Sequence, residues 1–161
     1  MAEKVLETTQ GTYTVNDDSS VVFPQGIYAF EELRSFYILK MDDDNVFQLL
    51  QSEEKKDIAF IIINPYFFKK DYILNVREED LHEIGIQNKE EAEKVLSVFA
   101  IVTVNDNSMT ANLLGPVIVN TEKKLGKQAL ALNEEYHTKH DILEELNSNK
   151  ELREALGVSA G

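Results

Sequence analysis

The sequence predicts a mainly β protein: a small antiparallel, barrel-like single domain with one short inserted helix and a helical C-terminal extension. The chain has 161 residues, enough for one ordinary domain. Its first 132 residues are mostly short runs rich in Val, Ile, Phe, Tyr and Leu, separated by turn-forming residues. Many short strands at a spacing of about 8–12 residues are typical of a closed barrel or a sandwich. We therefore assign residues 1–140 to the β domain and residues 141–161 to the helical extension.

Ten segments of this β region are predicted strands. The run Ile58–Ile63 lacks polar alternation, so we expect it to be buried on both faces. The Gly115–Pro116 pair should place a kink or bulge between two strand halves. The predicted strands are Thr12–Val15, Ser20–Phe23, Phe36–Lys40, Val46–Leu50, Ile58–Asn64, Tyr72–Val76, Val95–Val104, Thr110–Leu114, Val117–Asn120 and Gly126–Leu132.

Helical patterns are shorter and fewer. The segment Arg77–Ile84 opens with acidic residues in its first turn, which suits the helix dipole, and stops at Gly85. The segment Asn88–Glu93 predicts a single helical turn before the long strand. In the C-terminal extension, the run Ser148–Glu151 fits a capping box, so that residues 141–161 predict two short helices.

Charge and cysteine content exclude several classes of protein. Sixteen Lys and Arg against 29 Asp and Glu give a net charge of −13. Such a chain repels phosphates, which argues against nucleic-acid binding and against an anionic membrane surface, and it favours basic partners. The absence of cysteine excludes disulfides, thiol catalysis and Cys-based zinc sites. Neither a secretory signal nor a membrane-spanning run is visible, so we expect a cytoplasmic protein, monomeric when free.

Catalytic equipment is sparse. His137 and His140 are three residues apart and could share a helical face next to a carboxylate, as in a small metal-dependent hydrolase. The alternative is that both lie in a polar exposed segment, because no third ligand has a diagnostic spacing. The chain has no nucleophile motif and no Gly-rich phosphate loop. We therefore expect a protein that is not an enzyme and needs no cofactor or metal, with the hydrolase as the alternative.

Three consecutive aromatic residues, Tyr66, Phe67 and Phe68, are the first candidates for binding a protein partner. Neighbouring side chains in an extended segment alternate in direction, so at least one should be exposed, where aromatic residues often carry binding energy. The alternative is that all three fold back over one end of the barrel.

Two further groups are candidates for protein binding. The acidic run Asp42, Asp43 and Asp44 is either a solvated surface or a site for a basic partner. In the extension, Ile142, Leu143 and Leu146 form an apolar patch that must dock on the barrel or on another protein. We favour docking on the barrel, because a free patch invites self-association.

The order of several motifs resembles a known family. The segment Met109–Asn120 (MTANLLGPVIVN), followed by Gly126–Gln128, resembles the signature of the bacterial flagellar assembly factor FliW. The segments Phe23–Glu31 (FPQGIYAFE), Phe47–Ser52 (FQLLQS) and Ile58–Tyr72 resemble other motifs of that family in the same order. The resemblance covers roughly residues 4–140.

Two departures stand out, Ala29 in place of the family's Gly and Asn64 in place of its Asp. The resemblance implies a barrel-like β protein that is not an enzyme. Members of the family bind the homodimeric translational regulator CsrA, relieving its repression of messages that include flagellin's, and they also bind flagellin. Accumulating flagellin would then displace CsrA, and export of flagellin would reverse the exchange. The motifs do not say which residues make these contacts.

Overall fold

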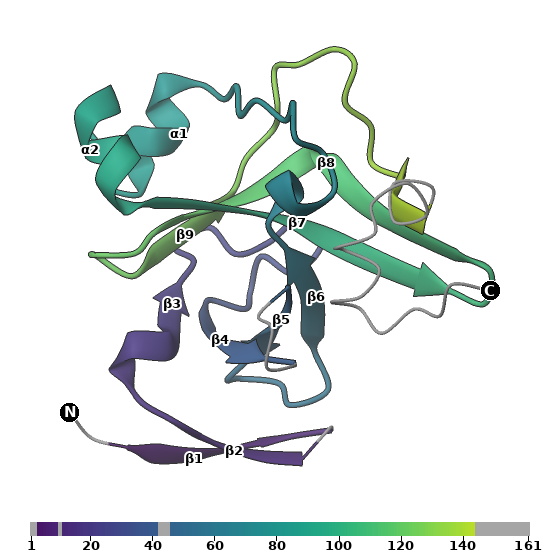
Figure 1. Ribbon diagram of the computed structural model, residues 1–161. Helices are drawn as coiled ribbons and strands as arrows, with labels where there is room; N and C mark the ends of the chain where they lie inside the picture. Colours follow the sequence, from purple (N-terminus) through teal and green to yellow (C-terminus); the bar gives the residue numbers. More distant parts are fainter. Residues whose placement is uncertain (1–2, 10, 42–45, 144–161) are drawn as a thin grey trace.

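The computed structural model describes residues 3–9, 11–41 and 46–143 (Figure 1). Strands dominate it, with two α-helices, α1 (Glu78–Glu83) and α2 (Lys89–Val95), and two 3₁₀ turns, η1 (Asp17–Ser19) and η2 (Pro65–Phe67). The strands are β1 (Lys4–Thr8), β2 (Gly11–Val15), β3 (Ser20–Val22), β4 (Ser35–Lys40), β5 (Phe47–Ser52), β6 (Ala59–Ile63), β7 (Leu96–Asn105), β8 (Ser108–Asn120), β9 (Leu125–Gln128) and β10 (His140–Asp141).

Seven of these strands close into a barrel, which confirms the predicted fold class. Strands β3 to β8 pair with their sequence neighbours in antiparallel order, and β9 pairs antiparallel with β8. The ring closes where Val22 of β3 pairs with Leu125 of β9, the one parallel pairing among the described strands. The two-residue β10 adds to the outer part of β8, beyond the ring.

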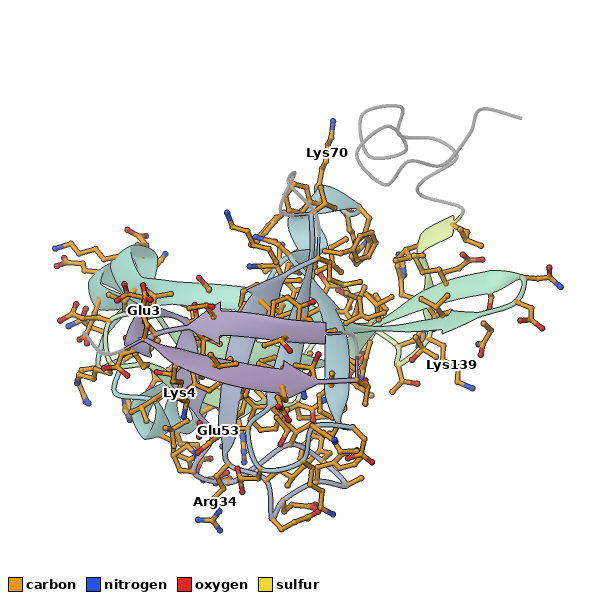
Figure 2. All side chains as sticks on the ribbon, turned by 90° about the horizontal axis from the view of Figure 1, so that it is seen from below. Glu3, Lys4, Arg34, Glu53, Lys70 and Lys139 are labelled. Carbon is orange, nitrogen blue, oxygen red and sulfur yellow. The ribbon has the colours of Figure 1, made fainter. Side chains whose placement is uncertain are left out.

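Apolar side chains pack in three places. Inside the barrel, alternate residues of the strands form one core around Phe36, Leu50 and Ile62. The outer faces of β7 and β8 are covered by the segments before and after them, and this is the largest core. The β1–β2 hairpin lies across the outside of the barrel (Figure 2). There it buries Leu39 and Leu49 on the outer face of β4 and β5.

Two predicted features of the strands differ from the structure. The strand β1 was not predicted, because only Leu6 of its five residues is buried. The segment Tyr72–Val76 is extended but joins no sheet. Its alternating burial reflects packing on the outer face of the barrel rather than strand pairing. A single backbone–backbone hydrogen bond, from the Leu132 N–H to the Asn75 carbonyl, joins this segment to residues 129–136.

The predicted break at Gly115–Pro116 is present as a bulge within one continuous strand, β8. Phe99 pairs with Val117 and Ile101 with Asn112, so residues 113–116 lie opposite Ala100 alone. Asn112 Oδ1 accepts from the Gly115 N–H and Gln128 Nε2 donates to the Gly115 carbonyl, which satisfies the backbone that the bulge frees.

The predicted helical extension lies outside the described residues beyond Leu143. Within the described ranges, no helix is long and apolar enough to cross a membrane.

Candidate partner-binding groove

The three aromatic candidates separate into two classes. Asn64 Oδ1 caps η2 by accepting from the Tyr66 N–H at 3.0 Å, and this 3₁₀ turn replaces the alternation of an extended chain. Tyr66 and Phe67 are 50% and 42% exposed, so both are available to a partner. Phe68 is buried and stacks on the His140 ring, so its proposed role in partner binding is corrected to a role in the core. Lys70, just after this turn, points into solvent (Figure 2).

The other candidates fall in two groups. Ile142 is fully buried in the outer core and Leu143 packs against it, so Ile142 is a core residue and not a partner contact, as the favoured alternative of docking on the barrel expects. This supports docking of the start of the extension on the barrel. The remaining candidates, Asp42, Asp43, Asp44 and Leu146, lie outside the described residues.

A groove of about 700 Å³ opens beside the aromatic turn. Its lining comes from the extended segment Tyr72–Val76 on one wall and from α1, α2 and the start of β7 on the other. Its apolar lining includes Leu74, Val76, Leu81 and Ala92. Apolar concave surfaces with polar rims are the usual form of binding sites.

Exposed apolar side chains continue the groove outwards. Tyr66 lines it at one end, and Ile73 on its wall is 65% exposed. Leu132, 50% exposed, lies next to Asn75 of that wall, because its N–H donates to the Asn75 carbonyl. We call Tyr66, Ile73 and Leu132 the apolar rim. Exposed apolar residues gathered at a groove are typical of an interaction surface.

Tyr72 is the unusual residue of the groove. Its ring stacks on Tyr136 and meets Tyr66 edge to face, and the side chain is 3% exposed. Within the described part of the chain, its buried hydroxyl has no hydrogen-bond partner. Burial, with smaller contributions from Tyr136 and Tyr66, raises the pKa of the Tyr72 phenol far above its ordinary value. The group is therefore a protonated donor without an acceptor.

The wall formed by α1 is fixed to the barrel by ion pairs. Asp80 is fully buried and accepts from Lys127 of β9 at 2.7 Å and from Arg77 at 3.1 Å. Lys127 also contacts Glu83, which accepts from Gln25 at 3.0 Å. Burial acts to raise the pKa of Asp80, but hydrogen bonds from Lys127 and Arg77 outweigh it and lower that pKa. Burial likewise acts to lower the pKa of Lys127, and its bonds to Asp80 and Glu83 raise it.

Two acidic side chains and one basic one, Lys89 of α2, line the mouth of the groove. Glu78 of α1 and Glu93 of α2 both line the groove, and neither forms an ion pair with a described residue. Asn88 caps α2 by accepting from the Glu91 N–H at 2.8 Å, which sets the direction of that helix. The result is an apolar floor whose edge carries two glutamates against Lys89, which suits an apolar segment that carries a Lys or Arg.

Sequence reasoning did not find Ile73, Leu132 or the Tyr72 hydroxyl. One signal was available in Ala129–Leu132, where small and large apolar residues alternate. The two alanines are buried and the two leucines are exposed. In a segment with strand-like alternation, buried small residues let the backbone lie close to the core. The large residues between them then point outwards. The hydroxyl depends on packing that no sequence pattern shows.

The two histidines of the alternative hydrolase do not form a metal site with described residues. The His137 carbonyl accepts from Leu113 and Leu114, and the His140 ring stacks on Phe68. Across residues 3–9, 11–41 and 46–143, no three His, Asp or Glu side chains gather where they could hold a metal ion.

Comparison with known proteins gives consistent matches. The family described as FliW protein matches residues 4–142. The flagellar assembly factor FliW of Alkaliphilus metalliredigens is 36% identical over 151 residues, covering 91% of each chain. That of Leptospira interrogans is 35% identical over 134 residues, covering 83% of this chain and 89% of its own. That of Caldicellulosiruptor saccharolyticus is 38% identical over 141 residues, covering 86% and 90%.

A solved structure agrees with the fold. The crystal structure of the flagellar assembly factor FliW superimposes with a TM-score of 0.75 at 28% identity, covering 88% of this chain and 96% of that one. The seven-stranded barrel and its outer coverings are therefore the architecture that the two chains share.

Proposed function

This chain belongs to the FliW family of flagellar assembly factors, and from that membership we propose that it works by binding two proteins in turn, the translational regulator CsrA and flagellin. Binding to CsrA relieves repression of the flagellin message. Flagellin that accumulates occupies this protein and releases CsrA, and export of flagellin reverses the exchange. The chain thus acts as a chaperone and regulator rather than as an enzyme.

The observation that carries the proposal is identity of 36% over nine-tenths of both chains with a flagellar assembly factor. The physical character of the molecule supports it. CsrA binds RNA and must present basic groups, and the chain carries a net charge of −13. The groove, with its apolar rim and with Glu78 and Glu93 at its mouth, is the surface we assign to partner binding. No observation favours the hydrolase over this function.

A single titration tests the proposed exchange. CsrA is first bound to a labelled RNA carrying the leader of the flagellin message, and the fraction of bound RNA is followed by fluorescence anisotropy. Addition of this protein should release the RNA, and later addition of flagellin should restore binding. The proposal is wrong if the RNA stays bound at an excess of this protein, or if released RNA does not return when flagellin is added.

A further inference from the structure

The edge of β7 beside the groove has no strand next to it. Strand β6 pairs with β7 only at Ala100, Ile101 and Val102, because Pro65 turns the chain away after Ile63. Residues 96–99 pair with β8 on their other side. Within the described part of the chain, no backbone bond joins 96–99 to another strand on the groove side, although the Leu96 N–H donates to the Ala92 carbonyl at the end of α2.

The opposite wall of the groove is also extended and only half bonded. In the segment Tyr72–Val76, the Tyr72 N–H donates to the Lys69 carbonyl, and the other backbone bonds lie at Ile73 and Asn75. The Ile73 N–H donates to the Tyr136 hydroxyl, and the carbonyls of Ile73 and Asn75 accept from residues 132–133. The backbone groups of Leu74 and Val76 have no partner among the described residues. Successive residues of an extended chain direct these groups to opposite sides, so those of Leu74 and Val76 face away from 132–133.

We propose that the groove receives an extended segment of a protein partner, which adds as a strand to the free edge of β7 at residues 96–99 and accepts a hydrogen bond from the Tyr72 hydroxyl. The unsatisfied backbone groups supply a main-chain ladder, as in other cases of strand addition. Tyr72 supplies a donor that is buried without an acceptor in the free protein, which is costly unless a partner satisfies it.

The chemistry of the groove defines the segment that fits. Small or medium apolar side chains on one face would pack on Leu74, Ala92 and Leu96. A Lys or Arg residue beside them would meet Glu78 or Glu93, which form no ion pair with a described residue although Lys89 also lines the groove. The segment is therefore extended, basic and apolar at alternate positions. This inference deepens the proposed function, because the segment would belong to one of the two protein partners.

A short synthetic peptide of alternating lysine and valine tests the mode of binding without either protein. The full chain is labelled with ¹⁵N, and its amide resonances and their hydrogen exchange are followed as the peptide is added. We expect saturable shifts at residues 72–76 and 96–99 and slower exchange in 96–99. Two control peptides should fail: one with glutamate for lysine, and one with N-methylated valines, which cannot donate to a ladder.

Other outcomes contradict the inference. Shifts confined to other parts of the barrel would place the binding surface elsewhere. Equal binding of the N-methylated peptide would reduce the interaction to charge and apolar contact, with no added strand. If the peptides fail while CsrA and flagellin bind, the inference is wrong and the proposed function stands. If the basic peptide binds as described and neither protein does, the inference stands and the proposed function is wrong.

Tyr72→Phe with Tyr136→Phe as its matched control tests the hydroxyl. Tyr72→Phe removes a donor that is unsatisfied in the free protein, so the thermal midpoint should be unchanged or higher, while affinity for the basic peptide falls about fivefold. Tyr136→Phe removes the acceptor of the Ile73 N–H, so its midpoint should fall. A lower midpoint for Tyr72→Phe, or unchanged peptide affinity, would contradict the assigned role of Tyr72.

Discussion

At the scale of single residues, Asp80 shows how charge stabilises the frame of the groove. Its carboxylate is completely buried, which is costly for a charged group unless cations compensate it. Lys127 and Arg77 supply that compensation from β9 and from the start of α1. The ion pair between Asp80 and Lys127 joins residues 47 positions apart in the sequence and holds α1 against the barrel. Removing one member leaves the other charge buried, so the site is sensitive to substitution and to pH.

Asp80→Asn should lower the free energy of unfolding by about 3 kcal/mol near neutral pH. The pKa of Asp80 is lowered in the folded state, so its contribution is complete above the unfolded pKa of about 3.9 and is lost as pH falls through the folded value. The difference between wild type and variant should therefore be constant near neutrality and shrink below about pH 4, as measured by urea denaturation across pH.

The control for this variant is Glu79→Gln. Glu79 also pairs with Arg77, at 3.2 Å, but both side chains are more than half exposed. Exposed pairs contribute between about 0 and 1 kcal/mol, so the control should change stability little at any pH. A difference between wild type and Asp80→Asn that grows towards acid pH would contradict the assigned ionisation of Asp80.

The residue-level predictions from sequence were limited by packing. A local pattern identified the aromatic run. Tyr66 and Phe67 are exposed, which agrees with the expectation that at least one of the three aromatic side chains faces solvent. The pattern could not place Phe68, because η2 turns the chain through a 3₁₀ geometry in which alternation no longer applies. The burial of Asp80 depends on Lys127, and no periodicity connects the two. The acidic start of α1 was visible, but not which of its carboxylates is inside.

At the scale of elements, the β1–β2 hairpin acts as a cover for the barrel. It forms a separate two-stranded sheet, and such a sheet is marginal in isolation. Leu6 and Val15 pack on Tyr37, Leu39 and Leu49, which would otherwise face solvent. Lys4 pairs with Glu53 at one edge of the hairpin (Figure 2). The hairpin therefore depends on the barrel for order, and the outer face of β4 and β5 depends on the hairpin for burial.

Leu6→Ala should lower the free energy of unfolding by about 2–4 kcal/mol, because it leaves a cavity between hairpin and barrel. Hydrogen exchange should increase first in β1 and β2, with the interior strands unaffected. Val5→Ala is the matched control on the same strand, since Val5 is 65% exposed and should cost less than about 0.5 kcal/mol. Equal destabilisation by both variants would show that the hairpin does not dock through Leu6.

The predictions of elements succeeded for strands with strong apolar character. They failed where the conformation of a segment depends on contacts with distant parts of the chain. The strands β4 to β8 were all predicted to within a few residues, including the bulge at Gly115–Pro116. The sequence of Tyr72–Val76 has the same character as these strands. It lies outside the sheet because its backbone bonds go to the Lys69 carbonyl, the Tyr136 hydroxyl, the Asn133 side chain and the Leu132 amide. The sequence pattern alone does not distinguish an extended segment that joins a sheet from one that packs outside it.

At the scale of the whole molecule, the net charge of −13 should govern how fast the protein meets a basic partner. The association rate with CsrA should fall by about tenfold or more from low to high salt, because the Debye length at physiological ionic strength is only about 8 Å. Glu78→Gln combined with Glu93→Gln should weaken this salt dependence more than the same charge change at Glu7 of β1 and Glu122 of the turn after β8, both of which are exposed. Stopped-flow fluorescence measures the association rates. A rate that does not change with salt would contradict a role of net charge in the encounter with CsrA.

The central claim, that this chain acts by exchanging protein partners, is tested most directly by sedimentation velocity on the purified proteins. The chain should form a saturable complex with CsrA and another with flagellin. When flagellin is added in excess to the complex with CsrA, free CsrA should appear together with the flagellin complex. Failure to form either complex, or a stable assembly of all three proteins with no release of CsrA, would contradict the claim.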